Sequence, residues 1–149
     1  MRARMFTLAL GLVFAVAGRA GAQTRDVTYI DAVKTTAAFA RGVPLLEVED
    51  YKVHASRRTA AGMAEVHERD TDIIYVLEGT ATFVTGGRVV DGKMTALEEI
   101  RGVSIDGGQT LRLSRGDFVV VPAGTPHWFK EVGGTLLYYV VKVPNGGRP

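Results

Sequence analysis

The chain has 149 residues, with 18 lysines and arginines against 16 aspartates and glutamates, and it contains no cysteine. The lack of cysteine excludes disulfides, thiolate metal ligands and a cysteine nucleophile, so the folded domain must rely on its core. The near-balance of charge gives no reason to expect a nucleic-acid or anionic-membrane surface.

The first 22 residues predict a secretory signal peptide. Two arginines precede an apolar run over residues 5–17, and Ala20 and Ala22 occupy the positions expected before a cleavage site. The run is shorter than the ~20 residues that span a bilayer, which disfavours a retained membrane anchor. Cleavage after Ala22 leaves a single domain, residues 23–149, with 15 basic and 16 acidic residues. We therefore expect an exported protein, periplasmic or secreted, with no membrane span in the mature chain.

Residues 29–44 predict one short helix near the start of the mature chain. Asp31 can cap its N-terminus, and Gly42 followed by Pro44 ends it. Its buried face is expected to carry three apolar residues, Val33, Ala37 and Ala40.

Beyond this helix the chain reads as short strands rich in valine, isoleucine, threonine and aromatic residues. We expect them at residues 45–56, 65–67, 73–77, 80–85, 88–90, 100–105, 110–113, 118–121, 127–132 and 136–143. Glycine-rich turns separate them, and residues 145–149 are expected to form a loose tail. Many short strands with such turns are typical of closed or double-sheet antiparallel folds.

Two histidines and two carboxylates stand at the ends of these predicted strands. Glu65 and His67 point to the same side if their segment is extended, because strand side chains alternate between faces. Asp72 begins the next strand, and His127 begins a later one after a Pro-Ala-Gly turn. A mixed nitrogen and oxygen site of this kind suits a divalent ion of Mn, Fe, Co, Ni or Zn.

The spacing of these residues follows two motifs. Gly116-x5-Pro122-x-Gly124-x2-His127 matches the second motif of the cupin superfamily, which the chain therefore resembles. The usual first cupin motif is His-x-His-x4-Glu-x6-Gly. Residues 65–79 keep every spacing of it, but Glu65 replaces the first histidine and Asp72 replaces the glutamate.

The resemblance implies an all-β fold, a single jelly-roll β-barrel over about residues 45–143 preceded by the short helix. It also implies a bound metal, with His67, Asp72 and His127 in ligand positions and Glu65 where a histidine ligand usually stands. Glu65 is then either a fourth metal ligand or an uncoordinated general base in catalysis. Asp72 is either a ligand or a group that orients a histidine, since it is one methylene shorter than glutamate.

Other polar residues allow two interpretations each. His54 is expected to be a surface or cavity-lining residue rather than a ligand. The pair Arg57 and Arg58 either binds an acidic substrate at the mouth of the barrel or forms a solvated face.

Strand alternation also predicts which aromatic residues face outward. Phe129 should share the inner side with His127, and Trp128 should lie opposite. Tyr75 and Leu77 should lie on the outer face, where an N-terminal segment or a partner subunit of a homodimer would cover them.

We expect the chain to be a metal-dependent enzyme, an oxidoreductase, lyase or isomerase, acting on a small organic molecule. The main alternative is a non-catalytic module that binds a small ligand such as a carbohydrate. A structural cupin without a working site, similar to seed-storage proteins, is a third. Fold alone does not choose among them, because function depends on the pocket.

Overall fold

The computed structural model describes residues 26–145, so the predicted signal peptide, residues 1–22, lies outside the described residues, as does most of the predicted tail. The helix is present as α1 (Ala32–Arg41), with Asp31 accepting a hydrogen bond from the backbone N–H of Lys34 at 2.8 Å. Gly42 ends it in the left-handed conformation, at a φ of 64°. Among residues 26–145 there is no helix with the length and apolar character that crossing a bilayer requires.

The rest of the described chain is β-structure. Its strands are β1 (Pro44–Glu47), β2 (Lys52–Arg58), β3 (Ala64–His67), β4 (Asp70–Thr85), β5 (Arg88–Val90), β6 (Lys93–Ala96), β7 (Glu99–Gly102), β8 (Ser104–Asp106), β9 (Gln109–Ser114), β10 (Phe118–Val121) and β11 (His127–Pro144). Every pairing between them is antiparallel.

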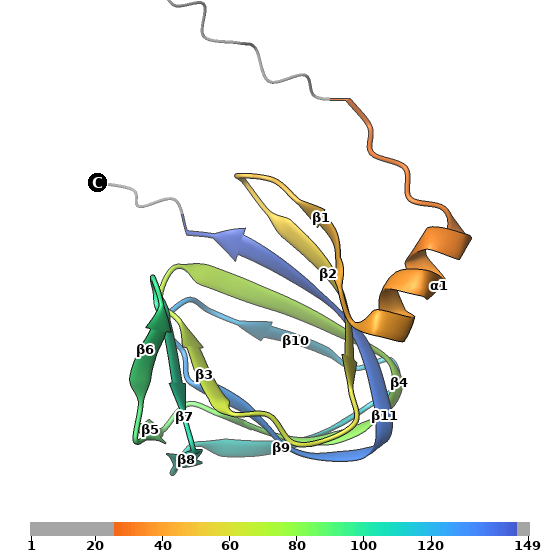
Figure 1. Ribbon diagram of the computed structural model, residues 1–149. Coiled ribbons are helices and arrows are strands. Elements are labelled where there is room, and N and C mark those ends of the chain that lie inside the picture. Colours follow the sequence, from red (N-terminus) through yellow and green to blue (C-terminus); the bar gives the residue numbers. More distant parts are fainter. Residues whose placement is uncertain (1–25, 146–149) are drawn as a thin grey trace, which may run out of the picture.

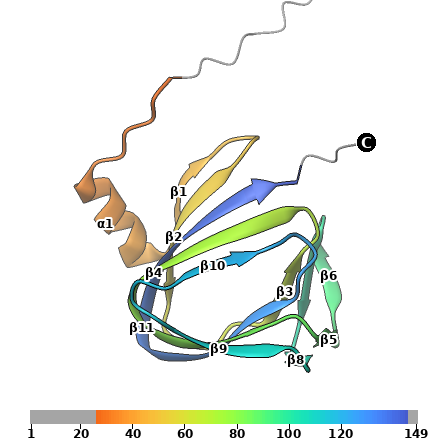
Figure 2. The same cartoon turned by 180° about the vertical axis from the view of Figure 1, so that it is seen from behind.

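Nine of the strands of residues 26–145 form two packed layers that share the long strands β4 and β11, and β5 pairs with β8 in a separate two-stranded sheet. In the first layer the order is β1, β2, the second half of β11, the first half of β4, and β10. In the second layer it is β9, the second half of β4, the first half of β11, β3, β7 and β6. Figures 1 and 2 show β4 and β11 curving from one layer into the other. The result is a jelly-roll sandwich whose hydrogen-bonded sheet is not closed among residues 26–145, so the expected barrel is an open one.

The expected strand boundaries were wrong at these two long strands. Residues 73–77 and 80–85 are one strand, and so are residues 127–132 and 136–143, because the glycines between them bend the strands instead of reversing them. The register of β11 against β4 shifts twice around Leu137. The first shift lies between Gly133 and Leu137 and includes Gly134, and the second follows Leu137 directly. Three further differences are the exposed strand β6, which was not expected, the division of residues 45–56 into the antiparallel pair β1 and β2, and the division of residues 100–105 into β7 and β8.

The core lies between the layers and follows the predicted alternation. Asp72, Ile74 and Val76 point inward from β4, and Phe83 continues this inner face beyond the bend. Phe129 packs edge to face on Phe83 with ring centroids 4.9 Å apart, while Trp128 lies on the other side and donates its indole N–H to the Gly62 carbonyl. The predicted inner position of Phe129 is therefore confirmed.

Helix α1 covers part of the outer face of the first layer. Its buried residues are Ala38 and Phe39, not the predicted Val33, Ala37 and Ala40, and Val33 is 79 % exposed. Phe39 packs edge to face on Tyr139 at 5.0 Å, and Leu77 lies in the same cluster. The N-terminal segment thus covers Leu77, as one of the two expectations proposed.

The remainder of this outer face is apolar and exposed. Phe118 and Tyr75 are cross-strand partners on β10 and β4, and they are 62 % and 40 % exposed; Val120 beside them is also exposed. A partner subunit that covers these residues stays a prediction.

Gly79 shows why the first motif ends in glycine. It lies in β4 at a φ of 83°, and a Cβ there would overlap the Thr135 carbonyl and come within 3.0 Å of the Leu136 Cα on β11. Glycine therefore permits the close approach of β4 and β11 at their common bend.

We predict that Gly79→Ala destabilises the protein much more than Gly107→Ala. Gly107 also has a positive φ, 74°, but nothing lies within 4 Å of its Cβ position, so it carries the conformational cost alone, about 1–2 kcal/mol. Gly79→Ala should cost roughly 2 kcal/mol more, because backbone atoms of β11 must move as well. Urea denaturation of both variants measures the difference, and equal losses would contradict the steric argument.

Candidate metal centre

The register of the second layer places three functional side chains in one row. Arg101 on β7 pairs with Glu65 on β3, and Glu65 pairs with His127 at the start of β11. Directly opposed residues share a face of the sheet, and this face looks into the sandwich. Glu65 and His127 are buried, with 8 % and 4 % of their surface exposed.

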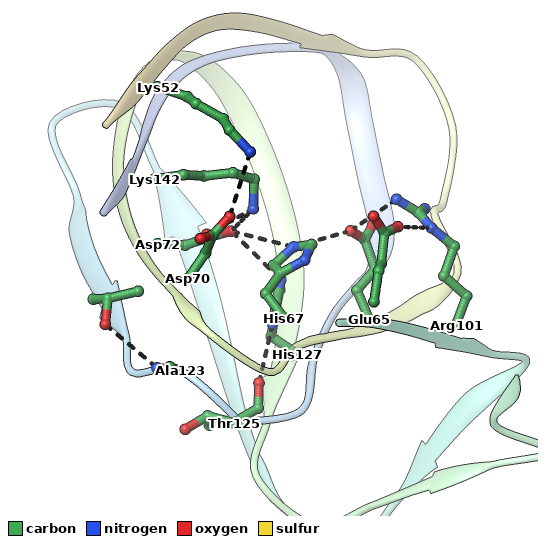
Figure 3. Close-up of polar contacts among 12 residues, drawn as sticks. Lys52, Glu65, His67, Asp70, Asp72, Arg101, Ala123, Thr125, His127 and Lys142 are labelled. Atoms are coloured by element: carbon green, nitrogen blue, oxygen red, sulfur yellow. Dashed lines mark hydrogen bonds and ion pairs between the residues drawn. The ribbon is translucent and has the colours of Figure 1, made fainter. Parts of the chain in front are cut away.

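A second row from the first layer faces the same space. Lys142 on β11 is the cross-strand partner of Asp72 on β4. The Lys142 ammonium lies 2.7 and 2.9 Å from the two carboxylate oxygens of Asp72, which is 4 % exposed. Figure 3 shows the two histidines between these rows, with Asp72 and Lys142 on one side and Glu65 and Arg101 on the other.

The Pro-Ala-Gly turn of the second motif fixes His127 against the first motif. The backbone N–H of Gly124 donates to the carbonyl of His67 at 2.8 Å, and Thr125 closes the turn onto Pro122 at 3.1 Å. The Thr125 carbonyl lies 3.2 Å from Nδ1 of His127. A carbonyl only accepts, so Nδ1 carries the proton and Nε2 presents a lone pair to the cavity.

Ligand-type atoms of Glu65, His67 and His127 converge in the cavity, and an Asp72 oxygen lies near the two histidines. Nε2 of His67 lies 3.6 Å from Oε2 of Glu65 and 3.5 Å from Oδ2 of Asp72, and Nε2 of His127 lies 3.8 Å from the same Asp72 oxygen. Glu65, His67 and His127 each offer an atom within 4.8 Å of the other two.

These separations fit a metal ion. They exceed the usual length of a hydrogen bond. With ligand bonds near 2.1 Å, neighbouring donors around one ion lie about 3.0–3.4 Å apart, so a small contraction would close the set. The residues present therefore fit a divalent ion.

The state of His67 also suits a ligand. Burial lowers the pKa of His67, and the nearby Lys142 ammonium lowers it further, while Asp72 and Glu65 act in the opposite direction. The imidazole is therefore neutral at pH 7, which is the form that binds metals.

With this geometry described, the comparisons with known proteins identify the family. The cupin sequence profile matches residues 21–148. The chain belongs to the cupin family. No curated protein is similar enough in sequence to count as a match.

Solved structures show the same fold for this cupin at low sequence identity. A protein of Bacillus halodurans is similar with a TM-score of 0.59 and 16 % identity over 81 % of this chain and 84 % of that one. A conserved protein with a double-stranded β-helix domain from Klebsiella pneumoniae is similar with a TM-score of 0.51 and 18 % sequence identity. The match covers 70 % of this chain and 76 % of that one. Hydroquinone 1,2-dioxygenase from Sphingomonas sp. TTNP3, solved with 4-hydroxybenzoate bound, is similar with a TM-score of 0.50 and 14 % sequence identity. The match covers 71 % of this chain and 66 % of that one.

Arg58 forms one wall of the cupin's cavity. Its Nη2 donates to Oε1 of Glu65 at 3.1 Å, and its Nε donates to the Tyr138 hydroxyl oxygen at 2.9 Å. Its guanidinium lies over the ring of Phe129, 4.8 Å from the centroid. The sequence left open whether Arg57 and Arg58 face solvent or the cavity. Strand alternation gives one of each, because Arg57 is exposed and Arg58 points inward.

The cavity has a volume of about 280 Å³. Its charged lining consists of three cations and three acids, namely Arg58, Arg101, Lys142, Glu65, Asp72 and Glu99. His54 also lines it, with Nε2 3.2 Å from a carboxylate oxygen of Glu47 and outside the Glu65, His67 and His127 group, in agreement with the lining interpretation.

The structure brings Glu65, His67 and His127 together in one group, places Asp72 beside both histidines but outside that group, and adds cations that the sequence did not reveal. Asp72 meets both histidines, but Lys142 binds both of its oxygens; its role as ligand or as orienting group stays a prediction. Arg101 and Lys142 were missed because each seemed an ordinary charge in a strand. The available signal for Lys142 was its parity with the inward Tyr138 and Val140 in the otherwise apolar stretch of residues 136–143.

Tyr138 gives a test of the cavity wall. Burial raises the pKa of the Tyr138 hydroxyl, although the Arg58 charge opposes this. The unfolded chain loses this proton near pH 10, whereas the folded protein retains it to higher pH. The free energy of unfolding should therefore fall as the pH rises above about 10.

We predict that one of the five tyrosines ionises later than the others in an ultraviolet absorbance titration of the folded cupin. Tyr138→Phe should remove this late step, and the control Tyr51→Phe, at an exposed position, should leave it in place. Loss of an early step in Tyr138→Phe would show that the hydroxyl is not held as described.

Proposed function

We propose that this cupin is an exported, metal-dependent enzyme that acts on a small organic molecule between its two β-layers. One observation carries the proposal: Glu65, His67 and His127 place three ligand atoms within 4.8 Å of one another in a buried site. Two histidines and one carboxylate form the donor set of many non-haem iron(II) oxygenases. Oxidoreductase chemistry is therefore the first class to test, before lyase and isomerase chemistry.

The residues around the site have separable roles. When bound, a divalent ion of Fe, Mn, Co, Ni or Zn would supply a Lewis acid with positions open to small molecules. His127 is oriented by the Thr125 carbonyl, and Glu65 is held from two sides by Arg58 and Arg101. Oε2 of Glu65 faces His67, which favours Glu65 as a ligand over Glu65 as a general base.

The similar structures support an enzyme without identifying its substrate. The Sphingomonas protein of the same fold is a dioxygenase, and its structure holds a small aromatic acid. We take from it that a cupin sandwich of this size can hold a small organic molecule, and we propose the same for this chain.

A non-catalytic binding module is the second candidate, and one observation favours it. Each cavity carboxylate already has a cationic partner, and no buried side-chain nitrogen or oxygen within residues 26–145 lacks a hydrogen-bond partner. Such a cavity is complete without an ion. Metal content decides between the two candidates.

We predict that the purified protein holds about one equivalent of a divalent metal and that His67→Ala and His127→Ala each lower metal affinity at least about 100-fold. Loss of a residue that hydrogen-bonds a metal ligand typically lowers metal affinity about 10- to 100-fold, so loss of the ligand itself should lower the affinity by more than that. His54→Ala is the matched control, because His54 lines the same cavity but stands outside the group. Elemental analysis and metal titration measure the result, with circular dichroism to confirm folding.

Three results would change the proposal. Parent-like affinity in both histidine variants would place the metal elsewhere, and an equal loss in His54→Ala would remove the specificity. A parent protein that takes up no metal would favour the binding module. In the same series, Glu65→Gln should weaken metal binding if Glu65 is a ligand, or abolish turnover with metal retained if it is the base.

Export is a separate part of the proposal, supported by the sequence of the first 22 residues. We predict that protein recovered from the periplasm or medium of an expressing bacterium begins at Gln23. N-terminal sequencing or intact mass measures this. Recovery of the chain in the cytoplasm with Met1 retained would contradict it.

A further inference from the structure

The cavity contains an unusual number of cations for a metal site. Glu65 is bound by Arg58 and Arg101, at 3.1 and 3.4 Å, and Asp72 is bound by Lys142. Arg101 also pairs with Glu99 through its Nε. Apart from its histidines, three positive and three negative groups line the cavity, so these formal charges cancel before any ion enters.

A divalent ion changes this balance. It would raise the formal charge of the cavity to +2, because all three acids are already paired with side-chain cations. Uncompensated charge in a largely dehydrated site is costly, and the cost falls when a counter-charge enters.

We propose that the substrate of this site is a small organic anion that carries a carboxylate, and that the positive charges of Lys142 and Arg101 attract that carboxylate into the cavity. The inference rests on the proposed metal site and adds to it the chemical class of the ligand.

Lys142 and Arg101 are better placed to bind a ligand than Arg58. Figure 3 shows them on opposite sides of the two histidines, with Lys142 beside Asp72 and Arg101 beside Glu65. An ammonium has three donors and Lys142 makes two contacts to Asp72; Arg101 uses Nε and Nη2, which leaves Nη1 for a ligand among the contacts of residues 26–145. Arg58 is instead occupied by Tyr138, Glu65 and the ring of Phe129.

The size and the apolar wall of the cavity limit the rest of the ligand. A volume of about 280 Å³ lies just below the usual range of ligand pockets, which begins near 300 Å³. Ile74, Phe129 and Val140 supply an apolar surface between the two charged rows. The ligand is therefore a small carboxylate with a compact carbon skeleton that packs on these three side chains.

Calorimetric titration with matched pairs of probes tests this inference. The pairs are propionate with propionamide and benzoate with benzamide, which differ in charge but little in shape. Metal content is measured first, and each pair is titrated into metal-loaded and metal-free protein. In the loaded protein each carboxylate should bind at least about tenfold more tightly than its amide, because it gains charge-assisted hydrogen bonds.

Variants test whether Lys142 and Arg101 cause the preference for a carboxylate over its amide. Lys142→Met and Arg101→Gln should each reduce the preference about tenfold, whereas Lys130→Met, at an exposed lysine of the same strand, should leave it unchanged. Arg101 is 35 % exposed at its side chain, so its replacement gives a folded variant even if loss of Lys142 disturbs the buried Asp72. Circular dichroism and metal content accompany each titration.

The outcomes separate this inference from the proposed metal site. Loaded protein that binds carboxylate and amide equally, or binds neither, overturns the inference and leaves the metal site standing. Protein that takes up no metal and shows no preference overturns both. An equal preference with and without metal overturns the charge argument, because the metal-free cavity is formally neutral.

Discussion

The burial of two carboxylates between the layers is the constraint on which the rest of the site depends. Glu65 and Asp72 are almost inaccessible, and an isolated ionised carboxylate in such a place would cost several kcal/mol. Each therefore lies beside a cation supplied by its cross-strand partner, Arg101 for Glu65 and Lys142 for Asp72. The sheet register thus determines both the charge of the cavity and the position of its ligands.

Both motifs contribute to this register through the backbone as well as through their histidines. Gly79 lets β4 pass close to β11 where both strands bend, and so carries the first layer, with Asp72, over the second. The Gly124 N–H binds the His67 carbonyl, which ties the turn before His127 directly to the strand that carries the first motif. The glycines hold the two histidines in one place, with ring centroids 5.2 Å apart.

The sequence allowed the family and the helix to be recognised, and it singled out Glu65, His67 and His127, because these depend on local spacing and on strand alternation. It did not reveal that residues 70–85 and 127–144 are continuous strands, since a glycine that bends a strand and one that reverses the chain look alike in sequence. The roles of Arg101 and Lys142 were missed for a related reason. Pairing between segments 36 and 70 residues apart decides which acid each cation meets, and no local pattern contains that information.

The departure of Glu65 from the usual cupin motif can now be explained together with its neighbours. A histidine at this position would carry no negative charge, so Arg101 would keep only Glu99 and Arg58 would lose the acid that it contacts. Removal of one partner from a buried ion pair typically costs about 3–5 kcal/mol. Restoring the usual histidine would therefore restore a common ligand but lose the acid that holds both guanidiniums. Glu65, Arg58 and Arg101 form one electrostatic unit, and the ligand at position 65 cannot be changed independently of the cations that bind it.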